Sequence, residues 1–411
     1  MLGLLLSRLV RKGTLTLVHH DGKKEVFGSG EPRATIRLHD SKVGLEILLR
    51  PELVFGEAYM DGRLTADGDL YDALDILMTN MEGVKIPASL RMMRGARRVV
   101  RRFTQHNPAK RARQNVAHHY DLSGALYDLF LDSDKQYSCA YYSHTGEALE
   151  DAQTAKKRHI AAKLHLDRPG LDVLDIGSGW GGLALDLARD CGAKVLGVTL
   201  SEEQLAEAQA RAAKARLTDR VKFSLTDYRA LAGQFDRIVS VGMFEHVGVP
   251  YYNAFFEKTA ALLKDDGTML IHTIGRLDGA GATNPWITKY IFPGGYTPAL
   301  SEMLPAIERS GLFVTDVEVL RLHYAETLKA WRARFRDRWD EAARIYDERF
   351  CRMWDFYLIS SELGFRRQKL AVFQLQLAKS VEALPILRDY MVDDERSMRF
   401  AGTEHMPRAA E

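Results

Sequence analysis

A glycine-rich loop between an apolar strand and a helix constrains the fold of this chain more than any other feature. The segment Val173–Gly182 reads VLDIGSGWGG. Gly177 and Gly179 allow a sharp turn and a close approach of the backbone to a ligand, and the helix that follows offers free N–H groups. The spacing is GxGxGG with Asp175 inside the motif, and no Walker lysine follows, so neither a dinucleotide fingerprint nor a P-loop fits.

Short apolar strands alternate with helical segments from Leu171 onward. The expected strands are Val173–Ile176, Lys194–Val198, Val221–Ser224, Arg237–Val241 and Thr268–Thr273, and the clearest helices are Leu183–Arg189 and Glu202–Ala215. This alternation predicts a doubly wound, Rossmann-like α/β sheet. Together with the loop it indicates the class I methyltransferase fold, with S-adenosylmethionine as cofactor.

The 411 residues are more than one compact domain needs. Residues 1–10 predict a helix packed on the protein, 14–49 a small antiparallel sheet and 64–78 a helix. After Val319 the chain reads as helical to about Ala378. The domain prediction is therefore a small N-terminal α+β lipid or accessory domain at 1–83, a linker at 84–115, a catalytic domain with a helical lid and C-terminal helices at 116–390, and a tail at 391–411.

The linker has the most unusual composition in the chain. Ten Lys or Arg residues and no Asp or Glu lie between Lys85 and Arg113, and apolar residues fall on one helical face. A basic amphipathic helix suits an anionic membrane surface. A helix packed between domains, with solvated arginines, fits equally well. Nucleic-acid binding is disfavoured, because aromatic residues do not interleave with the basic ones and the formal net charge of the chain is only +2.

Composition favours a cytoplasmic setting, with any membrane contact peripheral. Three cysteines in a chain of this length do not form a disulfide framework, and no His/Cys cluster has the spacing of a zinc site. No segment approaches the roughly 20 apolar residues of a membrane span.

Polar residues follow several of the predicted strands, where ligands of open α/β sheets bind. Glu245 follows one strand and His272 ends another. A carboxylate and an imidazole at neighbouring strand ends suit proton removal or the binding of a small polar ligand, although each could be a structural residue. Gln204 begins the helix after the second strand, where it could bind the cofactor ribose, cap the helix, or do both.

These residues belong to motifs that resemble the cyclopropane fatty acid synthase family, including the mycolic acid cyclopropane synthases. The matching segments are 119–124, 137–141, 173–182, 198–204, 241–248, 290–294 and 322–328, in the same order as in the family. The segment Gly56–Gly62, GEAYMDG, is similar to the extra N-terminal domain of the longer bacterial enzymes. The resemblance therefore extends over nearly the whole chain.

The resemblance implies a two-stage reaction on an unsaturated phospholipid acyl chain. The cis double bond attacks the methyl group of S-adenosylmethionine, and a bound bicarbonate ion then removes a proton from the transferred carbon as a cyclopropane ring closes. The bicarbonate ligands of the family correspond to Cys139, Glu245, His272 and Tyr324, with a backbone contact at Ile274. Its cofactor contacts correspond to Tyr137, Ser138, Gly177, Gly179, Thr199, Gln204 and Tyr228, to which we add Asp175 of the glycine motif.

Other outcomes stay open within and outside this family. Relatives methylate an acyl chain without closing a ring, or methylate small-molecule amines, and a non-enzymatic lipid-binding protein is a further alternative. A homodimer is plausible because two membrane-binding surfaces would add avidity. We expect aromatic residues to keep the reacting carbocation away from water, with Tyr137, Tyr141, Phe244, Trp286 and Phe292 as candidates. Ser361 stands where some relatives carry a cysteine, and the implied mechanism needs no thiol there.

Overall fold

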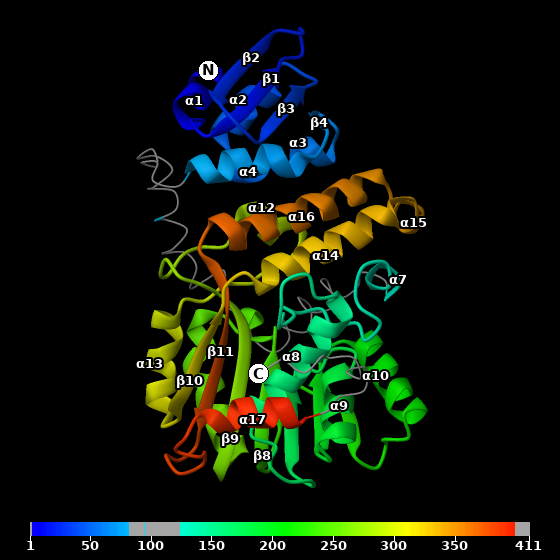
Figure 1. The fold of residues 1–411 in the computed structure, drawn as a ribbon, viewed down its shortest axis with the longest axis vertical. Coiled ribbons are helices and arrows are strands. Elements are labelled where there is room, and N and C mark those ends of the chain that lie inside the picture. The colour runs from blue at the N-terminus through cyan, green and yellow to red at the C-terminus, as the bar shows by residue number, and fades with distance from the viewer. Residues whose placement is uncertain (1, 82–94, 96–123, 399–411) are drawn as a thin grey trace, which may run out of the picture.

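The structure is a computed structural model that describes residues 2–81, 95 and 124–398. The basic segment predicted at 84–115 lies outside the described residues, apart from Gly95, and so does the predicted tail from residue 399 onward. Three parts follow one another along the long axis of the molecule in Figure 1. A small N-terminal unit, residues 2–81, lies at one end, a layer of long helices lies in the middle, and a large sheet flanked by helices lies at the other end.

The N-terminal unit contains four strands and four helices. In chain order they are α1 (Leu2–Leu9), β1 (Gly13–Val18), β2 (Lys24–Ser29), β3 (Arg33–Leu38), α2 (Val43–Leu49), α3 (Pro51–Met60), β4 (Leu64–Asp67) and α4 (Leu70–Met81). The first helix is confirmed. The expectation of a purely antiparallel sheet is wrong, because β2 returns along one edge of β1 and β3 then pairs in parallel with the opposite edge. Residues 43–49 are helical, and the helix expected from Leu64 begins at Leu70.

The large sheet has seven strands in the order β10-β11-β9-β8-β5-β6-β7. The strands are β5 (Asp172–Ile176), β6 (Lys194–Thr199), β7 (Val221–Leu225), β8 (Phe235–Val241), β9 (Leu263–Arg276), β10 (Phe313–Leu320) and β11 (Leu370–Ala378). From β7 to β9 every neighbouring pair is parallel, whereas β11 runs antiparallel to both of its neighbours. This arrangement confirms the predicted doubly wound class I methyltransferase sheet and all five predicted strands.

Helices cover both faces of this sheet because its central strands are nearly continuous apolar runs that need burial on both sides. One face packs against α8 (Leu149–Lys163), α9 (Gly182–Asp190) and α10 (Glu202–Lys214). The other packs against α11 (Tyr252–Leu262) and α13 (Leu300–Ser310). A further helix, α17 (Asp389–Ser397), lies against α8. Within β8, Ile238 faces one layer and Val239 the other, and both are fully buried.

Helices α12 (Pro285–Tyr290), α14 (His323–Asp337), α15 (Trp339–Ile345) and α16 (Glu348–Arg367) form a layer between the sheet and the N-terminal unit (Figure 1). The short helix α7 (Gly124–Tyr127) lies beside this layer. The expectation that the chain stays helical to Ala378 is wrong, because α16 ends at Arg367 and β11 then enters the sheet. Its pairing with β9 joins residues about a hundred positions apart in the chain, which local periodicity cannot reveal.

The N-terminal unit contacts this layer through ion pairs in which it supplies the acidic side chains. Acidic side chains of the N-terminal unit meet basic side chains of the catalytic part in the pairs Glu57–Lys289, Asp61–Arg349, Asp69–Arg332, Asp69–Arg336 and Asp75–Arg367. Beneath these pairs, Gly56 of α3 packs directly against Trp286 and Phe356. The N-terminal unit therefore supports α12, α14 and α16 from the side opposite the sheet.

Candidate active site

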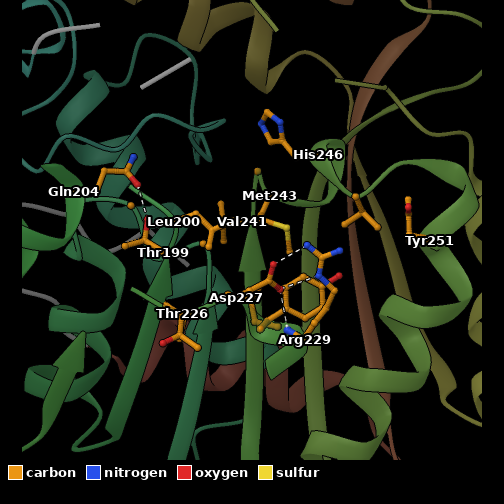
Figure 2. Close-up of a pocket in the computed structure, with 17 residues that line it drawn as sticks. Thr199, Leu200, Gln204, Thr226, Asp227, Arg229, Val241, Met243, His246 and Tyr251 are labelled. Carbon is orange, nitrogen blue, oxygen red and sulfur yellow. Dashed lines mark hydrogen bonds and ion pairs between the residues drawn. The ribbon is translucent and has the colours of Figure 1, made fainter. Parts of the chain in front are cut away.

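The carboxyl ends of β5, β6 and β8 form a pocket of about 820 Å³, its open mouth included. We call it the glycine-loop pocket, and Figure 2 shows its walls. It is lined by Ile176, Gly177, Gly179, Val198, Thr199, Leu200, Gln204, Thr226, Asp227, Tyr228, Arg229, Val241, Gly242, Met243, His246, Val247 and Tyr251. Gly177 and Gly179 have φ angles of 86° and 53°, a left-handed conformation that favours glycine.

Thr199 and Gln204 contact each other on one wall of this pocket. The Thr199 hydroxyl donates a hydrogen bond of 2.9 Å to Gln204 Oε1, drawn as a dashed line in Figure 2. The amide group of Gln204 thereby gains a fixed orientation, and its Nε2 donates to no other described residue. The Ser201 hydroxyl accepts a hydrogen bond from the Gln204 backbone N–H and caps α10. Gln204 thus lies in the first turn of α10 and also lines the pocket.

Several lining residues were not among the sequence predictions. Asp227 and Arg229 form an ion pair on either side of Tyr228, with 2.6 Å between Arg229 Nη2 and Asp227 Oδ2. Met243 and His246 line the pocket as well, and Figure 2 shows His246 set apart from the other labelled side chains. The sequence signal for Asp227 was its position just after β7, since polar residues at strand ends line ligand sites.

A second and larger cavity lies next to the glycine-loop pocket and shares Gly242 and His246 with it. We call it the inner cavity; it spans about 1440 Å³, open space at its mouth included. All five residues that the family resemblance assigns to bicarbonate line this one cavity, namely Cys139, Glu245, His272, Ile274 and Tyr324. Strands β9 and β11 and helices α12, α14 and α16 supply much of its wall, so residues from distant parts of the chain meet here.

Glu245 lies in a single helical turn directly after β8. Its Oε1 accepts a hydrogen bond of 2.6 Å from the Ile274 backbone N–H. Its Oε2 is buried and has no hydrogen-bond partner among the described residues. Burial raises the pKa of Glu245 to about 7, so the carboxyl group holds its proton over much of the neutral range. A protonated carboxyl with a free oxygen can donate a hydrogen bond to an anion.

His272 occupies β9 opposite Gln374 of β11. The Gln374 side-chain amide donates to His272 Nδ1 over 3.1 Å, which leaves the proton of the neutral ring on Nε2. Nε2 is buried and has no partner among the described residues. Burial, reinforced by the nearby Lys156 ammonium, lowers the pKa of His272 to about 3. His272 is therefore a neutral hydrogen-bond donor at physiological pH.

Cys139 and Tyr324 complete this wall from the segment before the sheet and from α14. The Cys139 thiol is almost fully buried, and its Sγ donates to the Ala140 carbonyl oxygen over 3.2 Å. Burial raises the pKa of Cys139 far above its usual range, so the side chain is a thiol rather than a nucleophilic thiolate. Tyr324 is 7% exposed and packs edge-on against Trp331.

Three residues predicted to contact the cofactor do not line the glycine-loop pocket. Tyr137 and Ser138 line the inner cavity instead. Asp175 lies buried in β5, and burial raises its pKa to about 7. Ser138 also accepts a hydrogen bond of 2.8 Å from the buried Lys156 ammonium. Gly177, Gly179, Thr199, Gln204 and Tyr228 do line the glycine-loop pocket.

The five aromatic side chains expected to keep water away from the carbocation do not line one cavity in the structure. Tyr137 and Phe292 line the inner cavity. Tyr141 stacks between His159 and His323, Phe244 packs in the core with Phe255, and Trp286 packs against Phe356. The interior of the cavity instead gains Tyr296, Tyr357 and Phe365, which the sequence did not single out.

Comparison with known proteins places this geometry in a family. The family model described as mycolic acid cyclopropane synthetase matches residues 107–375. The chain belongs to this family. A second model, a domain of unknown function, matches residues 4–85.

Relatives of the cyclopropane synthetase family cover most of the chain. It is 38% identical over 358 residues to the cyclopropane-fatty-acyl-phospholipid synthase of Escherichia coli K12, which covers 86% of this chain and 90% of the relative. It is 36% identical over 389 residues to the tuberculostearic acid methyltransferase of Mycobacterium tuberculosis, which covers 91% of this chain and 90% of the relative. The solved structure of the mycolic acid cyclopropane synthase CmaA1 with SAH and CTAB is 33% identical, with a TM-score of 0.61, and covers 66% of this chain and 98% of that one. The protein is an S-adenosylmethionine-dependent methyltransferase of this family.

Proposed function

We propose that this methyltransferase converts the cis double bonds of phospholipid acyl chains into cyclopropane rings. One observation carries the proposal: five anion-ligand candidates line a single cavity whose wall is shared with the glycine-loop pocket. The E. coli relative, which is named for the same reaction on a fatty-acyl phospholipid, supports it. The solved relative holds CTAB together with SAH, and CTAB carries a long alkyl chain.

The inner cavity has the donors that a bound bicarbonate needs. Oε2 of Glu245 and the Nε2–H of neutral His272 have no hydrogen-bond partner in the part of the chain that the structure describes, and the thiol of Cys139 lines the same cavity. Leaving such groups without a partner costs about 1–3 kcal/mol each, and a bound anion would recover that cost. When bound there, bicarbonate would supply the base that accepts the proton of the transferred methyl carbon. Glu245, His272, Cys139, Tyr324 and the backbone at Ile274 would hold it.

The chain contributes positioning and exclusion of water to the reaction. An alkene is a weak nucleophile, so holding it against the methyl group at the shared wall does much of the catalysis. Its π electrons form the new bond to the methyl carbon while the carbon–sulfur electrons return to sulfur. The electron pair of the broken C–H bond then closes the ring. Aromatic side chains such as Tyr137 and Phe292 shield the carbocation from water until that happens.

The decisive experiment is expression in a bacterium that lacks cyclopropane lipids, followed by mass spectrometry and NMR of its fatty acids. We expect unsaturated chains to gain the mass of one methylene group and to show cyclopropyl proton signals. No gain in mass would refute the proposal. Alanine at Glu245 should abolish ring formation while binding of S-adenosylmethionine persists, and full activity of that variant would refute the bicarbonate site.

A second product is favoured by the similarity to the tuberculostearic acid methyltransferase, whose name describes methyl transfer. Ring closure and formation of a methylene branch each release one proton after methyl transfer, so these two products have the same mass, and the NMR signals of a cyclopropyl or a methylene group separate them. A methyl-branched product carries two further hydrogens, which a reductant must supply, so its mass distinguishes it. Because a base also removes the proton that gives the methylene branch, variants at Glu245 should impair both deprotonated products.

We further propose that the enzyme is cytoplasmic and associates peripherally with membranes. Among the residues with described coordinates, no helix is long and apolar enough to cross a bilayer. The basic segment 84–115 is the proposed membrane contact. Replacing Arg94, Arg98 and Arg101 by Gln should reduce co-sedimentation with anionic vesicles, and unchanged binding would reject that contact. A homodimer would increase avidity for the surface, and sedimentation equilibrium would test it.

A further inference from the structure

One cationic side chain in the inner cavity has no role in the reaction described above. Arg276 ends β9 and lines the cavity together with His272 and Ile274 of the same strand. Side chains two and four residues apart project from the same face of a strand. The face of β9 that presents His272 to the proposed anion site therefore also presents Arg276.

Burial decreases along this face and shows where the cavity opens. His272 is 2% exposed, the Arg276 side chain is 21% exposed, and the adjacent Leu277 is 51% exposed. The paired residues of β11 follow the same direction, with Gln374 opposite His272 and Leu370 opposite Arg276. Leu370 and the exposed Gln368 line the cavity too. Arg276 thus lies at the mouth and His272 in the interior.

Two of the three nitrogen atoms of the Arg276 guanidinium group are hydrogen-bonded. Its Nε and Nη2 donate to the two carboxylate oxygens of Asp278 over 2.7 and 2.9 Å. Its Nη1 makes no hydrogen bond to a described residue, and its partner Asp278 is partly exposed, with 40% of the side chain open to solvent. Gly281 packs so closely on the guanidinium that a Cβ there would overlap it, and Thr283 and Asn284 of the same loop line the mouth.

The spacing along β9 fits the dimensions of a phospholipid. Four residues of strand separate His272 from Arg276 by about 13 Å. A bilayer core of about 30 Å holds two acyl chains end to end, so the middle of one chain lies roughly 7 to 8 Å from its ester. A double bond held near His272 then leaves about 5 Å for the ester, glycerol and phosphate to reach the guanidinium.

We propose that Arg276 binds the anionic group of the lipid substrate at the mouth of the inner cavity, and that its distance from His272 selects double bonds near the middle of the chain. This inference rests on the proposed function, which makes an acyl lipid the substrate. Arginine suits the role because its planar fork matches phosphate and carboxylate oxygens. A phosphodiester and the carboxylate of a free fatty acid share this chemistry, and the test separates them.

Binding is measured by calorimetry in detergent micelles that contain oleoyl lysophosphatidylglycerol, oleate or uncharged mono-oleoylglycerol. Wild-type protein should bind an anionic lipid more tightly than the uncharged one, and Arg276→Gln should weaken binding of that anion about 10-fold or more without affecting the uncharged lipid. A larger loss with the lysolipid assigns the phosphodiester, and a larger loss with oleate assigns the carboxylate. An equal affinity of variant and wild type for both anions overturns the proposal.

Two further variants distinguish anion binding from a structural role of Arg276. Asp278→Asn removes the competing carboxylate and should tighten anion binding, the opposite of Arg276→Gln. If both variants weaken binding alike, Arg276 merely braces its loop and the proposal fails. Lys369→Gln is the matched control, because Lys369 is an exposed cation beside Leu370 that does not line the cavity. It should leave binding unchanged, and all variants should retain the wild-type Tm and affinity for S-adenosylmethionine.

Turnover provides the readout for double-bond selection. Phosphatidylglycerols with the cis bond mid-chain, nearer the ester or nearer the methyl end are offered in vesicles. Wild type should prefer the mid-chain lipid in kcat/KM, and Arg276→Gln should reduce that preference several-fold. A preference that the variant retains in full overturns the selection. If wild type forms no product from any lipid, the proposed function fails, while the binding experiment still decides whether Arg276 holds the anion.

Discussion

Burial shifts the pKa values of Glu245 and His272 in opposite directions, and both shifts favour the uncharged form of the side chain. The pKa of Glu245 rises to about 7, so its protonated form predominates below that pH, and His272 is neutral because its pKa falls to about 3. A cavity lined by a carboxylate would repel an anion, whereas these two neutral donors do not. The same burial that is unfavourable for their charged forms therefore favours binding of the proposed bicarbonate ion.

Replacing Glu245 by Gln should make the stability of the protein less dependent on pH. In the unfolded chain this carboxyl ionises near its ordinary pKa of 4.5, and in the folded protein near 7. The folded state therefore binds more protons between these values, and wild-type stability falls as the pH rises through this window and stays lower above it. The unfolding free energy of Glu245→Gln relative to wild type should rise by roughly 2–3 kcal/mol between about pH 5 and pH 8.

Urea denaturation of both proteins at several pH values measures this difference. Glu257→Gln serves as a control, because Glu257 is an exposed residue of α11, and it should show no such trend. A difference between Glu245→Gln and wild type that stays constant with pH would contradict the shifted titration.

At the glycine-loop pocket, Gln204→Ala should weaken binding of S-adenosylmethionine about 10-fold. The expected loss corresponds to about one net hydrogen bond, since the Gln204 amide is oriented by Thr199 and faces the pocket. Equilibrium dialysis with the labelled cofactor measures it. Gln209→Ala, on the same helix but outside the pocket, should bind normally. Equal affinity of Gln204→Ala and wild type would remove Gln204 from the cofactor site.

Among the elements, α3 shows how closely the N-terminal unit fits the helices that line the inner cavity. A Cβ on Gly56 would lie 2.5 Å from Trp286 Nε1 and 2.8 Å from Phe356 Cε1. Both neighbours are bulky and buried, and Trp286 Nε1 donates to Met60 Sδ over 3.3 Å. Little room remains for either ring to move.

Gly56→Ala should therefore destabilise the protein by about 1–3 kcal/mol, the usual cost of overpacking, although alanine is the better helix former. Gly44→Ala is the matched control on α2, because its Cβ would lie 3.5 Å from the nearest atom, in ordinary contact with Leu38 Cδ1. It should stabilise by about 0.5–1 kcal/mol. Denaturant midpoints measure both, and a stabilised Gly56→Ala would show that the α3 contact is looser than described.

Sequence periodicity correctly predicted the strands that show a clear apolar pattern. It failed for β11, whose pairing partner lies far away in the sequence. The strands around the glycine loop are continuous apolar runs, so all five were found. In β11, Gln374 and Gln376 alternate with Leu375 and Leu377, a strand period that the preceding helix concealed. Its strand state depends on pairing with β9, which no local window contains.

The candidate site was predictable to the extent that its motifs are contiguous. The resemblance supplied Glu245 and His272, which the sequence alone already marked at strand ends. Tyr357 and Phe365 lie on α16, and only the packing of that helix over the sheet brings them to the cavity. His246 was visible beside Glu245, but nothing in the sequence showed that its ring lies between two pockets.

For the molecule as a whole, a charged interface holds the N-terminal unit to the catalytic part. Arg332 of α14 is the most buried basic residue in it, with its side chain 10% exposed. It bridges Asp69 of the N-terminal unit and the buried Asp355 of α16 at 2.6 and 2.7 Å. This one guanidinium joins three parts of the structure.

Arg332→Met should destabilise the protein by about 3–5 kcal/mol, because it leaves the Asp355 carboxylate buried without its cation. Arg349→Gln, whose ion pair with Asp61 is largely exposed, should cost under about 1 kcal/mol. Unfolding followed by tryptophan fluorescence measures both. Equal losses would mean that burial does not distinguish these two pairs.

The wall between the two pockets has a further consequence at Gly242. This residue borders both pockets, its φ is 70°, and a Cβ there would meet no atom within 4 Å. A small side chain would therefore cost the fold only about 1–2 kcal/mol of backbone strain, yet it would occupy open space beside the two pockets, where we propose that the methyl group is transferred. In a mutant library, sorting for abundant protein would retain alanine and serine at Gly242, whereas sorting for modified lipid would discard them. Selection for activity would therefore keep glycine at position 242 to preserve the open space there, not to preserve a contact.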